Sequence, residues 1–321
     1  MVAADGTSAT TRGGGTKKMR RNEDRLWVGT RARGRLFAEI RAFFLAQGVV
    51  EVDTPVRIPG NAPEMNIEAV RASGGWLRTS PELHMKRLLA HGAPAIFQMG
   101  PCFRAEERGA RHREEFTLLE WYRPGGDERT VLEDLKGLLE HLARAFWEGR
   151  TAGTWQGRPI SMAAADWEEI RVADAYRAAA GWDVLADFDA DRFDLDGVEK
   201  VEPWLPQGHP VALMGYPAAV AALSRRDEGD PRVARRWEAY LGGMELANAF
   251  YELTNPAEQR ARFEAENAAR VRMGHEPYPL DEDFLRELAD MPPTGGVALG
   301  LERVLMLLTD QRDIGEVAPF R

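Results

Sequence analysis

Apolar residues repeat at helical spacing in two stretches of the chain. In the first, positions 36, 37, 40, 43 and 44 are apolar and Gly48 follows; in the second, apolar residues from Leu132 to Phe146 recur mostly at intervals of three or four. This spacing is typical of helices that bury one face. Thr79-Ser80-Pro81-Glu82 combines capping residues with an early proline, and predicts a third helix that ends near Gly92.

Segments of strand character lie between and after these helices. They cover residues 49–52, 95–106, 114–123, 211–214 and 237–253, and a small-residue strand at 295–300 runs into a helix from Leu301. Asn255-Pro256-Ala257-Glu258 has the cap residue, proline and acid that open a further helix. We therefore predict an α+β fold with a mostly antiparallel sheet flanked by helices. Residues 148–210 show no clean periodicity and are treated as a variable region.

The composition is that of a folded globular chain. Of the 321 residues, 44% are hydrophobic, and residues 1–18 contain no apolar signal segment. No apolar run reaches the roughly 18 residues that a membrane helix needs. The single cysteine, Cys102, excludes an internal disulfide framework and a cysteine-rich zinc site. We expect a soluble, cytoplasmic protein that does not bind membranes.

Charge is distributed unevenly along the chain. The net charge is −9, but residues 1–35 carry nine basic and three acidic residues, which leaves −15 for residues 36–321. Such an acidic body lacks the broad basic face of a nucleic-acid-binding protein. Residues 1–22 are rich in glycine, serine, threonine and basic residues, and they predict a disordered basic tail before a single folded domain over residues 23–321.

The first group of candidate residues is a charged hairpin. Arg104 and Glu106 lie two residues apart on a predicted strand, so their side chains share a face, and Arg111, His112 and Arg113 follow. Guanidinium groups bind phosphate oxygens through two parallel hydrogen bonds, so the cluster suits a polyphosphate. Taken alone, an exposed hairpin with surface ion pairs explains the same residues.

Two further segments carry candidate chemistry. Residues 296–303 read Gly-Val-Ala-Leu-Gly-Leu-Glu-Arg, which lets a ligand approach the backbone and puts Arg303 in the first turn of a helix. Tight packing between strand and helix is the alternative explanation. Glu238, Glu245, Asn248 and Glu252 share one strand-rich segment. Clustered carboxylates of this kind either bind cations or face solvent.

Together the three segments resemble the signature motifs of class II aminoacyl-tRNA synthetases. Motif 1 corresponds to the helix before Gly48 with residues 49–55, motif 2 to residues 103–116, and motif 3 to residues 296–303. Residues 79–82, 116–122 and 245–254 are similar to the lysyl branch of the class. The resemblance covers residues 25–321 and implies a synthetase-like catalytic domain that uses ATP and Mg²⁺.

Lysyl-tRNA synthetases carry an N-terminal barrel that binds the anticodon, whereas motif 1 begins here almost at the start of the sequence. The sequence thus resembles the lysyltransferases that attach (R)-β-lysine, or lysine, to a lysine of elongation factor P. The resemblance implies an AMP- and pyrophosphate-forming ligase that modifies elongation factor P rather than tRNA. It also implies a homodimer through the motif 1 helix and Pro55. Two alternatives stay open: a stand-alone lysyl-adenylate enzyme with tRNA or another acceptor, and a non-catalytic regulatory paralogue.

The resemblance also implies the roles of individual residues. Adenylate formation needs no general base, because the attacking carboxylate is already ionised. Arg104 is expected to bridge the substrate carboxylate and the α-phosphate, while Arg303 holds the leaving phosphates with Arg111 or His112. These two arginines, Arg104 and Arg303, are the predicted catalytic residues. For the transfer step, the sequence indicates no base that deprotonates the acceptor amine.

The implied binding residues form three sets. The amino-acid substrate is assigned to Ser80, Pro81, Glu82, Tyr122, Asn248, Glu252 and Ala298. ATP is assigned to Arg104, Glu106, Arg111, His112, Arg113, Phe116, Glu245, Leu246, Gly300 and Arg303. Mg²⁺ is assigned to Glu238 and Glu245. Within these sets, Glu82 and Glu252 are expected to face the side-chain ammonium, Phe116 to stack on adenine, and Glu106 to accept from the adenine amino group.

Two departures from the family pattern bear on these roles. Residues 112–116 read His-Arg-Glu-Glu-Phe where relatives often have His-Asn-Pro-Glu-Phe, so Arg113 stands in place of an asparagine that contacts the nucleotide. Ala298 stands where tRNA-charging lysyl enzymes have glycine. The extra methyl group is worth about 1–3 kcal/mol and is expected to shift the pocket toward a β-amino acid.

Overall fold

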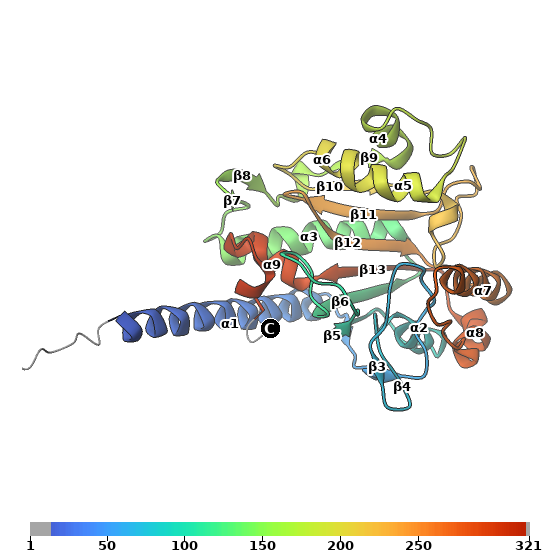
Figure 1. Ribbon diagram of the computed structural model, residues 1–321, viewed down its shortest axis with the longest axis horizontal. Helices are drawn as coiled ribbons and strands as arrows, with labels where there is room; N and C mark the ends of the chain where they lie inside the picture. The colour runs from blue at the N-terminus through green and yellow to red at the C-terminus, as the bar shows by residue number, and fades with distance from the viewer. Residues whose placement is uncertain (1–13, 319–321) are drawn as a thin grey trace, which may run out of the picture.

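An eight-stranded sheet organises the computed structural model, which describes residues 14–318, with side chains from residue 27 (Figure 1). The strand order is β1-β5-β6-β13-β12-β11-β10-β9. The β1–β5 and β9–β10 pairs are parallel and the other five pairs are antiparallel, so the predicted α+β fold is confirmed. In chain order, these strands are β1 (Val50–Glu51), β5 (Ile96–Phe103), β6 (Glu115–Pro124), β9 (Glu168–Arg171), β10 (Val211–Met214), β11 (Arg236–Leu241), β12 (Met244–Tyr251) and β13 (Thr294–Gly300).

Smaller sheets and helices complete the fold. One small sheet has the order β2-β4-β3, with β2 (Arg57–Ile58), β3 (Arg71–Ala72) and β4 (Gly75–Leu77); the other pairs β7 (Ala152–Trp155) with β8 (Arg158–Ser161). The α-helices are α1 (Gly14–Ala46), α2 (Glu82–Ala90), α3 (Glu128–Phe146), α4 (Val172–Ala179), α5 (Ala190–Asp196), α6 (Glu202–Trp204), α7 (Pro256–Arg272), α8 (Glu282–Glu287) and α9 (Leu301–Thr309). Short helical turns lie at 164–166, 197–201, 218–220, 288–290 and 314–316.

The hydrophobic core lies between one face of the large sheet and the helices α1, α3 and α9 (Figure 1). Leu36, Ile40 and Phe44 of α1 are fully buried, as their spacing predicts. Phe44 stacks on Phe97 of β5 with ring centroids 4.9 Å apart. Each such side chain contributes about 1.5–3 kcal/mol on burial. The periodicity of the sequence therefore identifies the correct face of α1.

Helix α1 is also joined to helix α9 and strand β6 by polar contacts. Arg33 Nη1 lies 2.8 Å from Glu302 Oε1 at the start of α9, and the second oxygen of Glu302 accepts from the Thr117 amide of β6 at 2.9 Å. The basic tail that we expected over residues 1–22 lies outside the described residues as far as residue 13. Residues 14–22 belong to α1, so there the structure is helical rather than tail-like.

The strand-rich segment at 237–253 folds as a hairpin rather than as one strand. Strands β11 and β12 are joined by Gly242 and Gly243, whose φ angles are 60° and 72°. Positive φ favours glycine, and this turn puts Glu238 on β11 and Glu245 on β12. The variable region contributes β9, which extends the sheet beside β10, and α5, which borders the polar face.

Among the described residues, we find no helix that combines the length and the apolar character needed to cross a bilayer.

Candidate active site

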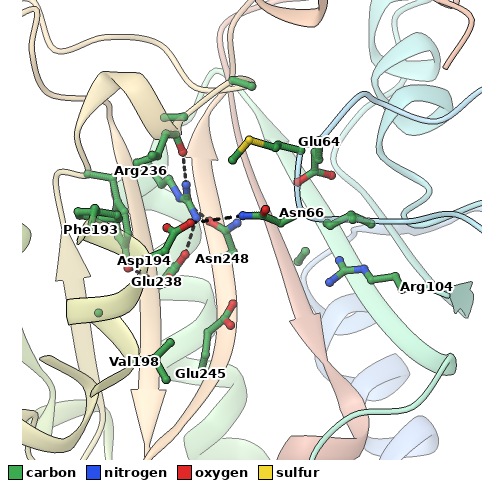
Figure 2. A pocket seen from close by; sticks show the side chains of 18 of the residues that line it. Glu64, Asn66, Arg104, Phe193, Asp194, Val198, Arg236, Glu238, Glu245 and Asn248 are labelled. Carbon is green, nitrogen blue, oxygen red and sulfur yellow. Dashed lines mark hydrogen bonds and ion pairs between the residues drawn. The ribbon is translucent and has the colours of Figure 1, made fainter. Parts of the chain in front are cut away.

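The polar face of the large sheet borders a cavity of about 850 Å³ (Figure 2). The loop at 59–70, the β5–β6 hairpin, the segment 190–202 and α7 all contribute to its lining. Twelve residues that the sequence analysis singled out line this cavity: Arg104, Arg111, His112, Arg113, Phe116, Glu238, Glu245, Leu246, Asn248, Ala298, Gly300 and Arg303. The fold thus brings motif 2, motif 3 and the β11–β12 carboxylates to one place.

One row of residues across five strands forms the floor of this region. The register aligns Gln98, Glu120, Ala298, Asn248 and Glu238 as successive cross-strand neighbours. Directly opposed residues project from the same face of a sheet. The methyl group of Ala298 therefore lies between a carboxylate on β6 and an amide on β12, where a change of one carbon alters the depth of the floor.

Arg104 directly follows β5 and extends into the cavity (Figure 2). Its guanidinium carbon lies 5.1 Å from the ring centroid of Phe116, and Nη1 is 3.6 Å from Glu107 Oε1. The Nε atom is buried and has no hydrogen-bond partner among the described residues. A buried donor without a partner costs about 1–3 kcal/mol, so Arg104 has a group to offer to an anionic ligand.

Arg303 lies in the first turn of α9, as predicted, and contacts the hairpin. Its Nη1 donates to the Glu245 carbonyl at 2.7 Å, and its Nη2 is 2.7 Å from Nε2 of His112. Burial and the Arg303 charge lower the pKa of His112, so its imidazole is neutral and accepts this hydrogen bond. Arg111 donates to the Gly243 carbonyl at 2.6 Å. Two cationic groups therefore share this end of the cavity.

Glu238 belongs to a closed hydrogen-bond network on the opposite wall. Its carboxylate pairs with Arg236 and accepts from the hydroxyls of Tyr216 and Tyr240, the latter at 2.7 Å. Arg236 Nε also donates to Asn248 Oδ1 at 3.1 Å. Burial and the Glu238 charge raise the pKa of both tyrosines well above the ordinary value, so their hydroxyls stay protonated. Arg236 therefore orients both Glu238 and Asn248.

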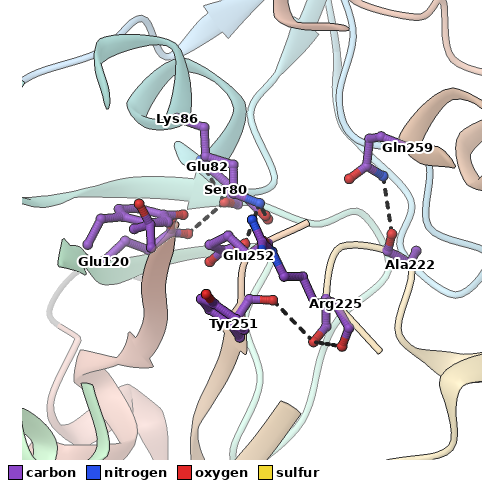
Figure 3. A network of polar contacts seen from close by, with 12 residues as sticks. Ser80, Glu82, Lys86, Glu120, Ala222, Arg225, Tyr251, Glu252 and Gln259 are labelled. Carbon is purple, nitrogen blue, oxygen red and sulfur yellow. Dashed lines mark hydrogen bonds and ion pairs between the residues drawn. The ribbon is translucent and has the colours of Figure 1, made fainter. Parts of the chain in front are cut away.

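A second polar group lies beside the cavity, and we call it the buried carboxylate cluster (Figure 3). Its members are Ser80, Glu82, Lys86, Glu120, Tyr122 and Glu252. Lys86 Nζ lies 2.5 Å from Glu82 Oε1 and 2.6 Å from Glu252 Oε2. Two hydroxyls donate to Glu120, from Ser80 at 2.6 Å and from Tyr122 at 3.0 Å. From the sequence we expected Glu82 and Glu252 to face the side-chain ammonium of the substrate; in the structure, Lys86 of the chain itself already contacts both.

The cluster contains three carboxylates and one ammonium group, which contacts two of them. Burial, with a contribution from Glu82, raises the pKa of Glu120 to about 7. Burial raises the pKa of Glu252 to about 8, although Lys86 partly offsets it. Burial alone would lower the pKa of Lys86, but Glu252 and Glu82 outweigh it and raise that pKa. The cluster is therefore short of positive charge, and the partly exposed Glu82 is the member that a further cation can reach.

Gly296 makes room for the cluster. A Cβ atom at this position would lie 2.1 Å from Glu252 Oε1 and 2.4 Å from Tyr122 Cε1. Both distances are far below van der Waals contact. The close approach of β13 to these two side chains therefore requires glycine, and this gives the small-residue run of motif 3 a physical reason.

Glu106 is the predicted nucleotide-binding residue that does not line the cavity. It is exposed, its φ is 66°, and its amide donates to Glu114 Oε1 at 3.1 Å. Its neighbour Glu107 lines the cavity instead. The sequence argument assumed strand alternation as far as residue 106, but β5 ends at Phe103 and the chain turns.

The remaining predicted substrate residues lie in or next to the buried carboxylate cluster. Pro81 is the N-cap of α2, and the Glu82 amide donates to Ser80 Oγ at 2.9 Å. The sequence analysis missed four polar residues of the site: Glu64, Lys86, Glu120 and Arg236. The i, i+4 spacing of Glu82 and Lys86 was a usable signal for an ion pair. Glu64 lies on a loop where no periodicity exists.

Comparison with known proteins decides the family. Residues 18–321 match the class II tRNA synthetases of the D, K and N type. The chain belongs to this family. Motif 2 of the class II synthetase falls on β5, the hairpin and β6, and motif 3 on β13 and α9, so the central strands of the sheet carry both.

Curated relatives that share one name align with nearly the whole chain. The elongation factor P–(R)-β-lysine ligase of Vibrio cholerae serotype O1 is 38% identical over 304 residues, which span 90% of this chain and 93% of that protein. The ligases of the same name from Vibrio vulnificus and Proteus mirabilis are each 38% identical, over 306 and 309 residues. These alignments cover 90% of this chain and 94% and 93% of the two relatives. This chain is thus similar along most of its length to ligases that share one name.

Proposed function

We propose that this chain activates (R)-β-lysine, or lysine, with ATP and transfers the aminoacyl group to a lysine side chain of elongation factor P. The observation that carries the proposal is the meeting of the motif 2 and motif 3 arginines in one cavity, directly beside a buried carboxylate cluster that is short of positive charge. The names of the relatives from Vibrio and Proteus support the same activity.

In the first step, the substrate carboxylate attacks the α-phosphorus of ATP, and pyrophosphate leaves. Both reactants are anions, so the barrier is largely electrostatic. Arg104 has an unused Nε donor and bridges the carboxylate and the α-phosphate as charge builds up between them. Arg303, together with Arg111 and the neutral His112, binds the phosphates that depart. Phe116 offers its ring to adenine.

Mg²⁺ fits two carboxylates on neighbouring strands. Burial and the Glu238 charge raise the pKa of Glu245, although Arg303, Arg104 and Arg236 oppose the rise, and a further cation would favour the ionised carboxylate. The single ion-pair partner of Glu245 in the described part of the chain is Arg303, at 3.4 Å. Mg²⁺ in nucleotide sites is commonly held by one or two carboxylates together with phosphates. Glu245 and Glu238 would hold the ion, which would neutralise phosphate charge.

The buried carboxylate cluster selects the amino acid. A lysine-type side chain brings an ammonium group, and Glu82 is its point of entry to the cluster, with Glu252 and Glu120 behind. A site built to hold a cation rejects a neutral isostere strongly, because the carboxylates are then left without compensation. Asn248, fixed by Arg236, is available to orient the substrate above Ala298.

Elongation factor P is favoured over tRNA as the acceptor. The chain has a net charge of −9, and binding of a phosphate backbone depends on lysine and arginine. We further propose a cytoplasmic homodimer that forms through α1 and Pro55, as in the class II pattern.

The deciding experiment measures the two half-reactions separately. Pyrophosphate exchange is followed with lysine and with (R)-β-lysine, and labelled amino acid is then offered to elongation factor P and to tRNA. We expect exchange with both isomers and label on elongation factor P, with none on a variant factor whose acceptor lysine is replaced by arginine. Charging of tRNA without transfer to the factor contradicts the proposal, and absence of exchange supports a regulatory paralogue.

A further inference from the structure

The transfer step needs a proton acceptor that the first step does not. An acceptor lysine has a pKa of about 10.4 and is an ammonium ion at neutral pH, without a lone pair for attack. The substrate carboxylate of the first step is already ionised. A base for transfer must therefore be a group that the adenylation chemistry leaves free.

Most carboxylates that line the cavity are occupied. Pairs or hydrogen bonds engage six of them: Glu107 with Arg104, Asp194 with Asn66, Glu238 with Arg236, Glu245 with Arg303, Glu266 with the Met65 amide, and Glu302 with Arg33. The two others, Glu64 and Glu202, have no side-chain hydrogen bond or ion pair among residues 27–318. Only these two are free to take a proton without breaking an existing contact.

Their surroundings separate the two candidates. The charges that act on Glu202 are those of Glu245, Glu238, Arg303 and Arg111, which is the end of the cavity assigned to the leaving phosphates. The charged groups that act on Glu64 are Arg104, Glu82, Arg236 and Glu266. Glu64 lines the same cavity as Arg104, the arginine proposed to hold the reacting carboxyl group, whereas Glu202 belongs to the end proposed for the leaving phosphates. In Figure 2 its carboxylate projects from the loop toward the space in front of Arg104.

The loop that carries Glu64 is anchored from behind. The fully buried Arg270 of α7 donates to the carbonyls of Glu64 at 2.9 Å and Ile67 at 2.7 Å. The neighbouring Met65 amide donates to Glu266 of the same helix at 2.9 Å. The backbone from Glu64 to Ile67 is thus anchored to α7, while the Glu64 carboxylate has no partner among the described residues.

We propose that Glu64 is the general base of aminoacyl transfer, an inference that rests on the proposed function. One Oε atom takes a proton from the acceptor ammonium, and the freed lone pair attacks the carbonyl carbon of the adenylate. A C–N bond forms and the C–O bond to phosphate breaks, with the electron pair leaving on AMP. The second nitrogen proton is released to water as the amide forms, so no further reactant is needed.

The electrostatics agree with this role. Burial raises the pKa of Glu64 to about 7; Arg104 and Arg236 oppose the rise, while Glu82 and Glu266 add to it. A base whose pKa lies near the working pH is the most effective, and such catalysis contributes about 10²–10⁴-fold. Glu120 has a similar pKa, but it already accepts two hydroxyl hydrogen bonds and does not line the cavity.

The test compares Glu64→Gln with the matched variant Glu202→Gln in the full chain. Pyrophosphate exchange reports adenylation, and hydroxamate formation reports attack by hydroxylamine, which is unprotonated at neutral pH and needs no base. We expect Glu64→Gln to keep both activities within about threefold of wild type while transfer to elongation factor P falls about 100-fold or more. Wild-type transfer should rise with pH up to about 7 and then level off, and this limb should vanish in Glu64→Gln but persist in Glu202→Gln.

Three results overturn the inference. If Glu64→Gln transfers at the wild-type rate and with the wild-type pH profile, Glu64 is not the general base. A parallel loss of exchange, hydroxamate formation and transfer places Glu64 in substrate binding instead. An equal loss in Glu202→Gln shows a general effect of cavity charge. Failure of the wild type to modify elongation factor P is a different outcome, since it refutes the proposed function itself, and the inference falls with it.

Discussion

The buried carboxylate cluster and the cavity lie next to each other on the same face of the sheet, but their charged groups differ in whether they have partners. In the buried carboxylate cluster, Lys86 is completely buried and bridges two carboxylates, and the hydroxyls of Ser80 and Tyr122 engage the third. In the cavity, Arg104 keeps a buried Nε without a partner and Glu64 keeps a carboxylate without one, among the residues that the structure describes. The comparison teaches that the ion pairs of Lys86 stabilise the fold within the cluster, whereas the Nε atom of Arg104 and the carboxylate of Glu64 remain available to ligands.

Removal of Lys86 should produce the largest change, and it should be a change in stability. Lys86→Met leaves the buried Glu252 and the partly exposed Glu82 without their cation, so the free energy of unfolding should fall by about 3–5 kcal/mol. Urea denaturation measures this. The control is Lys200→Met, which removes a half-exposed i, i+4 lysine paired with Asp196 and should cost less than about 1 kcal/mol. Equal effects of the two substitutions would show that the cluster does not depend on its internal cation.

Arg104→Ala should have the opposite profile. Pyrophosphate exchange should fall about 10²–10³-fold because a preorganised donor to the transition state is lost. The free energy of unfolding should change by less than about 0.5 kcal/mol, because in the protein without ligand the Arg104 side chain makes one long ion pair, with Glu107, and its Nε has no partner among the described residues. Arg108→Ala serves as control, since Arg108 lies in the same hairpin but is exposed and paired with Glu114. Normal exchange by Arg104→Ala contradicts the site assignment.

A smaller effect is expected at Ala298, where the two regions meet. Ala298→Gly deepens the floor by one methyl group and should shift the ratio of kcat/KM for (R)-β-lysine over lysine about tenfold toward lysine. Competition between the two isomers in pyrophosphate exchange measures the ratio. Ala249→Gly on β12 faces the core and should leave the ratio unchanged even if it lowers stability. If the ratio is unchanged in Ala298→Gly, residue 298 does not determine the preference between the two isomers.

An effect of about the same size is expected in the pH dependence of amino-acid binding. The pKa of Glu120 is about 7 and that of Glu252 about 8, so both carboxyls are largely protonated at pH 6 and become ionised as the pH rises. An ammonium group binds the ionised forms, so the KM for lysine should fall about tenfold between pH 6 and pH 8. In Glu120→Gln part of this change should disappear. In the absence of substrate, the same raised pKa values should make the free energy of unfolding decrease over this pH range, because the native state holds protons that the unfolded chain has released.

The sequence predicted the parts of the molecule whose signals are local. Gly48 ends α1, Asn255 caps α7 through bonds to two backbone amides, and Arg303 lies in the first turn of α9. The pattern at residues 237–253 predicts a strand-rich segment but not its turn, because two adjacent glycines do not by themselves distinguish a turn from an irregular position within a strand. The resemblance implies the adenine role of Glu106, and strand alternation predicts that it shares a face with Arg104; because β5 ends at Phe103, that alternation does not reach residue 106.

The parts that escaped prediction depend on contacts distant in sequence. The spacing of Lys86 indicates its local pair with Glu82 but not its contact with Glu252, and the place of Glu64 depends on Arg270 and Glu266 of α7, which fix its loop. No periodicity encodes such meetings. The same holds for the residues around residue 200. Their position at the cavity edge depends on the sheet that they cover, and no pattern in their own sequence predicts it.

The position of β13 has a consequence for how the protein is made. It is the last strand in the chain, yet it lies between β6 and β12 in the middle of the sheet, and α9 after it reaches back 269 residues to Arg33. Until β13 has been synthesised, its neighbours β6 and β12 each have an unpaired edge, and such edges are prone to pair with other chains. Because contacts of such long range form slowly, we expect a ribosome-bound fragment that stops before residue 294 to be aggregation-prone and devoid of adenylation activity.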